Sequence, residues 1–247
     1  MKKILSLFVA LVAVLSLAAC GKKESTAKGY GLVHKDYVGI AEITVDKKGV
    51  VTALTFEEVY LPTHWAGLAA TEGVDAGLFV TYTTSKGKEA NVAKYVVVDG
   101  KLFTATPVEK DVKYTSSDIA DLKAACKDNE ETAKWYAEAL LAGKAFAANA
   151  DGSKAAFEIT ADKEGGFKKS TTGYWPQGDK YPLGWKGNME ALSEALVGTS
   201  MGFADADLVK DAETKLWSFG GTVTKATLTD AKDYVAVAQK AYNTATK

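Results

Sequence analysis

The sequence predicts an α+β fold made of two similar units, each a hairpin-rich antiparallel sheet with packed helices. Two observations predict it. Short alternating runs bounded by turn residues are followed by stretches of helical periodicity. Several short motifs also recur later in the chain in the same order. The chain has 247 residues, 47% of them apolar, which is enough to build a real core.

Two hairpins are expected in the first half of the chain. Residues 37–45 and 50–56 are strand-like and flank a polar Asp-Lys-Lys-Gly turn. Asp99 and Gly100 separate two further apolar runs, and such a pair favours a type I′ turn, whose twist suits paired strands.

Helical periodicity replaces strand alternation after Tyr114. Ser116 or Ser117 is expected to cap a helix that continues to about residue 127. The polar segment 128–131 is expected to begin a second helix that ends near Gly143.

The chain then begins to repeat itself, which predicts a tandem duplication with a boundary near residue 148. The first unit would span residues 30–148 and the second residues 149–247, and both would open on a hairpin. The offset between matched segments falls from 116 to 112 residues, as short loop deletions would produce. The matched pairs are 42–49 with 158–165, 60–62 with 174–176, and 113–122 with 225–234.

The N-terminus has the pattern of an export signal. Lys2 and Lys3 precede an apolar run over residues 4–17, and small residues lead into Cys20. Leu17-Ala18-Ala19-Cys20 resembles the lipobox of bacterial lipoproteins. That resemblance implies a signal peptide over residues 1–19, lipid attachment at Cys20 and a tether over residues 20–29. The protein would then be anchored to the cell membrane by lipid, outside the cytoplasm.

Composition excludes several classes of function. All 30 basic residues are lysine, and the formal charge is −1, which disfavours nucleic-acid recognition because arginine forks and a basic stripe are missing. Only His34 and His64 could serve a histidine-based metal or catalytic site. Cys126 lies on an apolar helix face and is expected to be a buried packing residue. We therefore expect no metal site and identify no catalytic residue.

The C-terminal segment carries the one motif with chemical meaning. Residues 220–230 precede a helix expected over 230–244, and the segment resembles the signature of FMN-binding domains of exported flavoproteins, Asp-x-x-Thr-Gly-Ala-Thr. Thr224, Ala226 and Thr227 match that signature. The resemblance implies that a flavin transferase attaches FMN through its phosphate to Thr227. The tandem arrangement behind a lipobox is similar to extracellular electron-transfer lipoproteins.

Two positions depart from the signature. Lys225 stands for its glycine and Gly221 for its leading aspartate. A lysine side chain obstructs the close backbone approach that glycine permits. Lys225 could instead hold a phosphate non-covalently near the helix N-terminus. In the first unit Thr115 aligns with Thr227 but has neither the glycine nor the alanine beside it.

Each candidate residue has a purely structural alternative. Thr227 and Asp230 have capping-box spacing, so Thr227 could simply cap the last helix. Aromatic side chains could stack on an isoalloxazine ring or could belong to the core. The stacking candidates are Trp65, Trp175, Trp185 and Tyr174.

Two functions remain. The first is a surface redox carrier that binds FMN, with a membrane redox partner, or a descendant that has lost the flavin. The second is a non-redox lipoprotein that presents an aromatic-lined cleft to a small ligand or a partner. No nucleophile–base pair is visible, so either function is favoured over an enzyme with its own turnover.

Overall fold

The structure is a computed structural model and describes residues 23–179 and 181–247. Within them the fold is α+β, with four small antiparallel sheets and seven α-helices. The expected signal peptide and Cys20 lie outside the described residues.

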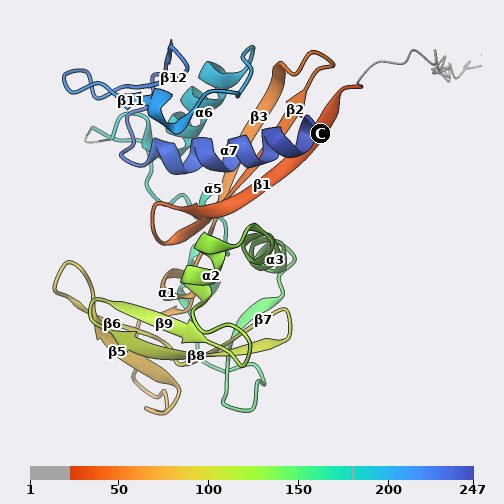
Figure 1. Cartoon of the computed structure of the whole chain (residues 1–247). Helices are drawn as coiled ribbons and strands as arrows, with labels where there is room; N and C mark the ends of the chain where they lie inside the picture. Colours follow the sequence, from red (N-terminus) through yellow and green to blue (C-terminus); the bar gives the residue numbers. More distant parts are fainter. Residues whose placement is uncertain (1–22, 180) are drawn as a thin grey trace, which may run out of the picture.

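The first sheet is a meander of three long strands (Figure 1). They are β1 (Ser25–Val33), β2 (Tyr37–Val45) and β3 (Val51–Tyr60). Asp46 Oδ1 closes the turn between β2 and β3 by accepting hydrogen bonds from the N–H groups of Lys48 and Val50, at 2.8 and 2.9 Å. The first expected hairpin is therefore confirmed.

The expected tether over residues 20–29 is wrong from Ser25 onward, because β1 begins there. Every residue of β1 pairs with a residue of β2, from Ser25 opposite Val45 to Val33 opposite Tyr37. Polar composition suggested a flexible segment, but ladder hydrogen bonds and the 3.2 Å cross-strand pair of Lys28 with Glu42 accompany a regular edge strand here.

The central part of the chain forms two more sheets, drawn below the first in Figure 1. The type I′ turn is confirmed, because Asp99 and Gly100 have φ values of 46° and 80°. One sheet has the order β4 (Gly67–Leu68), β6 (Glu89–Ala93), β5 (Phe79–Thr83). The other has the order β10 (Ala145–Ala148), β7 (Tyr95–Val98), β8 (Lys101–Val108), β9 (Asp111–Thr115).

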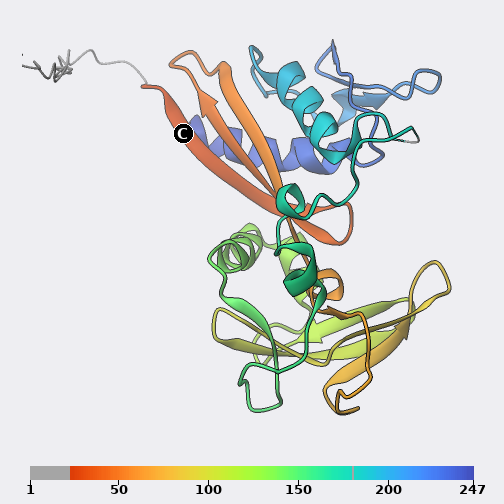
Figure 2. The ribbon, with the colours of Figure 1, turned by 180° about the vertical axis from the view of Figure 1, so that it is seen from behind.

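Helices α2 (Leu122–Asp128) and α3 (Glu130–Leu141) lie between the first sheet and the central sheets in both views (Figures 1 and 2). The start of α3 is confirmed, since Asn129 caps it by accepting from the Thr132 N–H at 3.1 Å. The expected cap of α2 is wrong. Asp121 caps that helix through the Ala124 N–H, whereas Ser116 holds a turn with Asp118 and Ile119. Cys126 is buried in α2, and burial raises the pKa of its thiol to about 12.

The expected second opening hairpin, over residues 158–165, is wrong. These residues form helix α4 (Thr160–Glu164), which ends at Gly165 with φ 83°. The Asp162 carboxylate accepts from the Ile159 N–H at 3.2 Å and stabilises the first turn. The matching residues 42–49 form a strand and turn because β1 and β3 pair on both sides of β2; residues 158–165 lack such neighbours.

The rest of the chain returns to the first sheet. The C-terminal helix α7 (Ala231–Ala245) crosses β1 and β2 (Figure 1), so the end of the chain shares a core with the first sheet. The remaining elements are α1 (Pro62–Trp65), α5 (Lys169–Thr172), α6 (Gly184–Leu196), a short 3₁₀ helix (Asp205–Asp207), β11 (Leu208–Lys210), β12 (Trp217–Phe219), β13 (Thr222–Val223) and α7 (Ala231–Ala245).

Close packing of α7 depends on a glycine in β1. A Cβ atom at Gly29 would lie 2.3 Å from the carbonyl oxygen of Val237 and 2.6 Å from the backbone nitrogen of Ala241. We expect Gly29→Ala to lower the free energy of unfolding by about 1–3 kcal/mol, because backbone atoms of α7 must move away.

Urea unfolding monitored by circular dichroism measures this effect. Gly202→Ala is the matched control, because a Cβ there meets nothing within 4 Å, and we expect a change within about 0.5 kcal/mol. Equal stability of Gly29→Ala and Gly202→Ala would contradict the packing described.

Candidate functional site

A cleft of about 1040 Å³ lies between β3, α6 and the segment that follows α5. Its aromatic wall contains Tyr174, Trp175 and Trp185, and Lys225 lies on its border. Four residues predicted from the sequence therefore line one space, although they are up to 51 positions apart between Tyr174 and Lys225. The volume is in the range of sites for small organic molecules and cofactors.

The aromatic wall is held against α6 by the backbone. The N–H of Trp185 donates to the carbonyl oxygen of Trp175 at 3.0 Å. Gly184 makes this approach possible, since its φ is 55° and a Cβ atom would lie 2.7 Å from the nitrogen of Gln177. Trp185 is almost fully buried, Trp175 is half-buried, and Tyr174 is 49% exposed. The wall therefore presents ring surface to the cleft.

Residues 224–228, the segment predicted to hold the FMN phosphate, border the cleft at Lys225, and their side chains alternate between buried and exposed. Thr224, Ala226 and Leu228 are buried, whereas Lys225 and Thr227 are exposed. Thr224 Oγ1 accepts from the Ala226 N–H at 3.0 Å, so this threonine stabilises the bend. The exposed hydroxyl of Thr227 lies two residues from the lysine that borders the cleft.

The capping alternative for Thr227 is wrong. Asp230 is the N-cap residue of α7, and no side chain makes a capping hydrogen bond at that helix end. The Thr227 hydroxyl donates to Asn188 Oδ1 over a long 3.5 Å, and the residue is exposed and lies outside the lining of the cleft.

Asn188, a buried residue of α6, fixes this segment. Its Oδ1 accepts from the N–H groups of Thr227 and Leu228 at 2.8 and 3.1 Å, and its Nδ2 donates to Gly184 O at 2.6 Å. The Asn188 side chain therefore links the Thr227 segment to Gly184, the residue that allows Trp185 to approach Trp175. Sequence reasoning missed Asn188, although a polar residue among the apolar helix positions 185, 189 and 192 was a visible signal.

Charged side chains of both signs line the cleft, and Lys210 lies beside Thr227. Lys225 and Lys186 line the cleft, and Lys210 Nζ lies 3.5 and 3.4 Å from the carbonyl oxygens of Thr227 and Leu228. Glu190 and Glu194 also line the cleft, and Glu190 lies 3.9 Å from Lys186. The lysines can neutralise a phosphate or carboxylate there.

Beneath the aromatic wall lies a buried ion pair, also missed from the sequence. Glu58 of β3 is fully buried; its Oε2 accepts from Lys169 Nζ at 2.8 Å and its Oε1 from Trp185 Nε1 at 2.6 Å. The hydroxyl of Tyr234 in α7 donates to the same Oε1, and burial together with the Glu58 charge raises the Tyr234 pKa well above its usual value. The signal was a charged residue between Phe56 and Tyr60 on the buried face of a strand.

The Lys169 ammonium is surrounded by rings. Its Nζ lies 4.4 Å from the ring centroid of Tyr37, 5.6 Å from that of Tyr174 and 5.8 Å from that of Trp175. These are distances of cation–π contacts, which orient the rings around the charge.

Two predicted residues lie away from the cleft. Trp65 is fully buried, and its Nε1 donates to the Tyr136 hydroxyl at 2.9 Å, so it is a core residue. Thr115 belongs to β9 in a central sheet, where its hydroxyl lies 3.4 Å from Thr104 O.

No group of His, Cys, Asp and Glu side chains suited to a metal ion occurs within residues 23–179 and 181–247. None of the helices in the same residues is long and apolar enough to cross a membrane. Comparisons with protein-family models, with curated proteins and with solved structures found no match.

Removal of one partner of the buried ion pair should be costly. We expect Glu58→Gln to lower the free energy of unfolding by about 3–5 kcal/mol, because Lys169 then stays buried without its counter-charge. The double variant with Lys169→Met should recover part of the loss. Urea unfolding measures both.

The exposed pair of Lys186 and Glu190 supplies the control for this experiment, and Glu190→Gln should change stability by less than about 0.5 kcal/mol. A Glu58→Gln variant as stable as Glu190→Gln would show that the buried pair does not hold the site together.

Proposed function

We propose that the cleft binds FMN or a similar planar anion, and that the protein is a lipid-anchored redox carrier outside the cytoplasm. The observation that carries the proposal is the meeting of an aromatic wall with Lys225 on one cleft, two residues from an exposed Thr227 hydroxyl. These are a stacking surface, a cation and an attachment point, the three features that a ring and a phosphate need.

The residues present fit such a ligand. Trp175 and Trp185 line the cleft with apolar ring atoms, and Lys225 and Lys186 of the same lining offer positive charge. A bound flavin would supply the electron chemistry. The chain itself would orient the ring against the aromatic wall, neutralise the phosphate and exclude water from one face of the ring.

The tandem relationship belongs to the same proposal. The matched segments 60–62 and 174–176 meet in space, since Tyr60 and Tyr174 both line a smaller cavity and their rings lie edge to face. A common origin of both units rests on the matched sequence segments and requires that the hairpin expected over residues 158–165 was lost in the second. Lipid attachment at Cys20, a flavin transferase and a membrane redox partner complete the proposed setting.

A second candidate function rests on Lys225. A lysine where the FMN signature has glycine gives the cleft a cation of its own, so a planar anion can bind without a covalent bond. The protein would then be a non-redox binding lipoprotein with the same cleft.

Covalent attachment separates the two functions. When the chain is produced with a flavin transferase and FAD, the Thr227 oxygen is expected to lose its proton and displace AMP from FAD. The intact mass should then rise by one FMN less one water, with flavin absorbance. We expect Thr227→Ala to abolish the adduct completely.

Thr229→Ala is the matched control, because Thr229 is also exposed and lies two residues further on; it should keep the adduct. Thr115→Ala should keep it as well. Unmodified, colourless protein that takes up no free FMN would refute the flavin proposal.

Non-covalent binding tests the aromatic wall separately. We expect Trp175→Leu to weaken the binding of free FMN by about tenfold, since a stacked ring pair contributes roughly 0.5–1.5 kcal/mol beyond the area it buries. Isothermal titration calorimetry measures this affinity.

Trp135→Leu is the control for this measurement, because Trp135 lies in α3 and donates to Asp99, far from the cleft lining. Equal FMN affinity of the Trp175→Leu and Trp135→Leu variants would show that the flavin ring does not stack on Trp175.

A further inference from the structure

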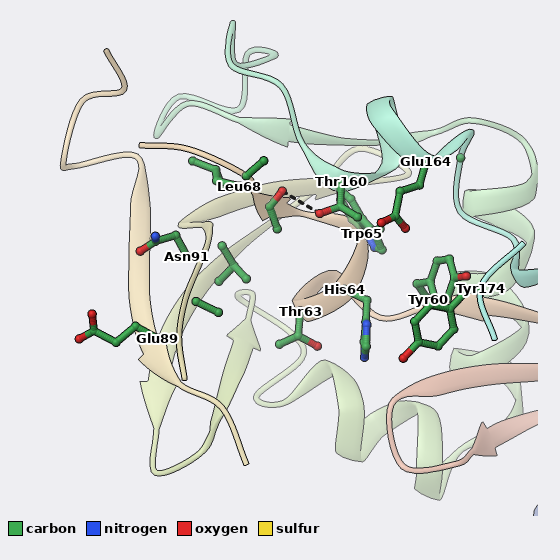
Figure 3. A pocket seen from close by; sticks show the side chains of 15 residues that line it. Tyr60, Thr63, His64, Trp65, Leu68, Glu89, Asn91, Thr160, Glu164 and Tyr174 are labelled. Atoms are coloured by element: carbon green, nitrogen blue, oxygen red, sulfur yellow. Dashed lines mark hydrogen bonds between the residues drawn. The ribbon is translucent and has the colours of Figure 1, made fainter. Parts of the chain in front are cut away.

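A second cavity, of about 440 Å³, also has Tyr174 in its lining (Figure 3). Residues of α1, α4, β4 and β6 surround it, so it lies where the first sheet meets a central sheet. Neither the FMN signature nor the cleft accounts for it.

One end of this second cavity is aromatic. The rings of Tyr60 and Tyr174 meet edge to face, with centroids 6.3 Å apart and planes at 88°. His64 lies 6.0 and 6.4 Å from the same two rings (Figure 3). The Tyr60 hydroxyl is hydrogen-bonded to Thr172, and burial raises the Tyr60 pKa to about 12, so this ring stays neutral and fixed.

Acidic and neutral polar groups form the rest of the lining. Glu89 and Glu164 contribute carboxylates, Asn91 contributes an amide whose oxygen accepts from Thr81 at 2.6 Å, and Thr160 donates to Gly67 O at 3.1 Å. Within residues 23–179 and 181–247 neither of these two carboxylates has an ion-pair partner. They are free to compensate a charge that enters from solvent.

Positive charge is missing from the same lining. No described lysine lines the second cavity. Burial lowers the pKa of His64, so the imidazole is neutral at neutral pH. Lys169, whose Nζ lies 5.6 Å from the centroid of the Tyr174 ring, is ion-paired with Glu58. The described lining of the second cavity therefore has two carboxylates and no lysine, whereas the lining of the cleft has side chains of both charges.

We propose that the second cavity binds a small organic cation, with its ammonium group beside Glu164 and the half-exposed ring of Tyr174 at one end of the cavity (Figure 3). Glu164 and, from the other end, Glu89 supply electrostatic attraction, and the Tyr174 ring supplies the cation–π surface that selects an ammonium over a neutral group of the same shape. This proposal does not depend on flavin binding in the cleft.

Choline and ethanolamine are the probes, and 3,3-dimethylbutan-1-ol is the neutral analogue of choline. Titrated calorimetrically into the full chain in detergent, at least one cation should bind with a Kd of about 1 mM, at least tenfold tighter than the neutral alcohol. Added salt should weaken the binding, because the cavity is open to solvent.

Variants place the binding. Glu164→Gln should weaken it by about tenfold and Glu89→Gln, at the other end of the cavity, by less, with little effect on folding because both side chains are exposed. Glu158→Gln is the matched control, since Glu158 is exposed, pairs with Lys163 at 3.4 Å and lies outside the lining. Trp135→Leu, outside the linings of both the cleft and the second cavity, should leave the affinity for the cation unchanged.

Three results would each overturn the proposal: no binding of either cation at concentrations of about 10 mM, equal binding of choline and its neutral analogue, or unchanged affinity in Glu164→Gln. Loss of FMN binding leaves all three measurements interpretable, so failure of the flavin proposal and failure of this one are distinguishable.

Discussion

The buried carboxylate of Glu58 is the constraint on which the cleft depends. It accepts hydrogen bonds from Lys169 in α5, Trp185 in α6 and Tyr234 in α7, so one side chain of the first sheet connects three separate helices. A buried charge is tolerated only when its partners are all in place. The geometry of the aromatic wall is therefore coupled to correct docking of the last helix.

This coupling explains how the chain is organised in space. The first strands and the last helix form one body, and the central sheets, which come between them in the sequence, lie on one side of it (Figures 1 and 2). The boundary expected near residue 148 coincides with the end of β10, but α5, α6 and α7, which follow it, pack on the first sheet. Similar sequence at residues 42–49 and 158–165 has two different structures because only the first segment has strands to pair with.

Local signals in the sequence were sufficient for local structure. The Asp99-Gly100 hairpin, the start of α3 in the polar segment 128–131 and the extent of α7 all follow from neighbouring residues, and the structure confirms them. The cleft residues Tyr174, Trp175, Trp185 and Lys225 were also found. Glu58, Lys169 and Asn188 were not, because a single polar residue in an apolar pattern does not reveal which distant group will pair with it.

Tyr174 is part of both the cleft and the second cavity, and it is half-exposed. Binding in the two spaces is then linked through this shared residue. A ligand in one space that favours one rotamer of Tyr174 changes the affinity for a ligand in the other space, and the second ligand changes the affinity for the first by the same factor. A single side chain of this kind is enough to make two neighbouring sites heterotropic.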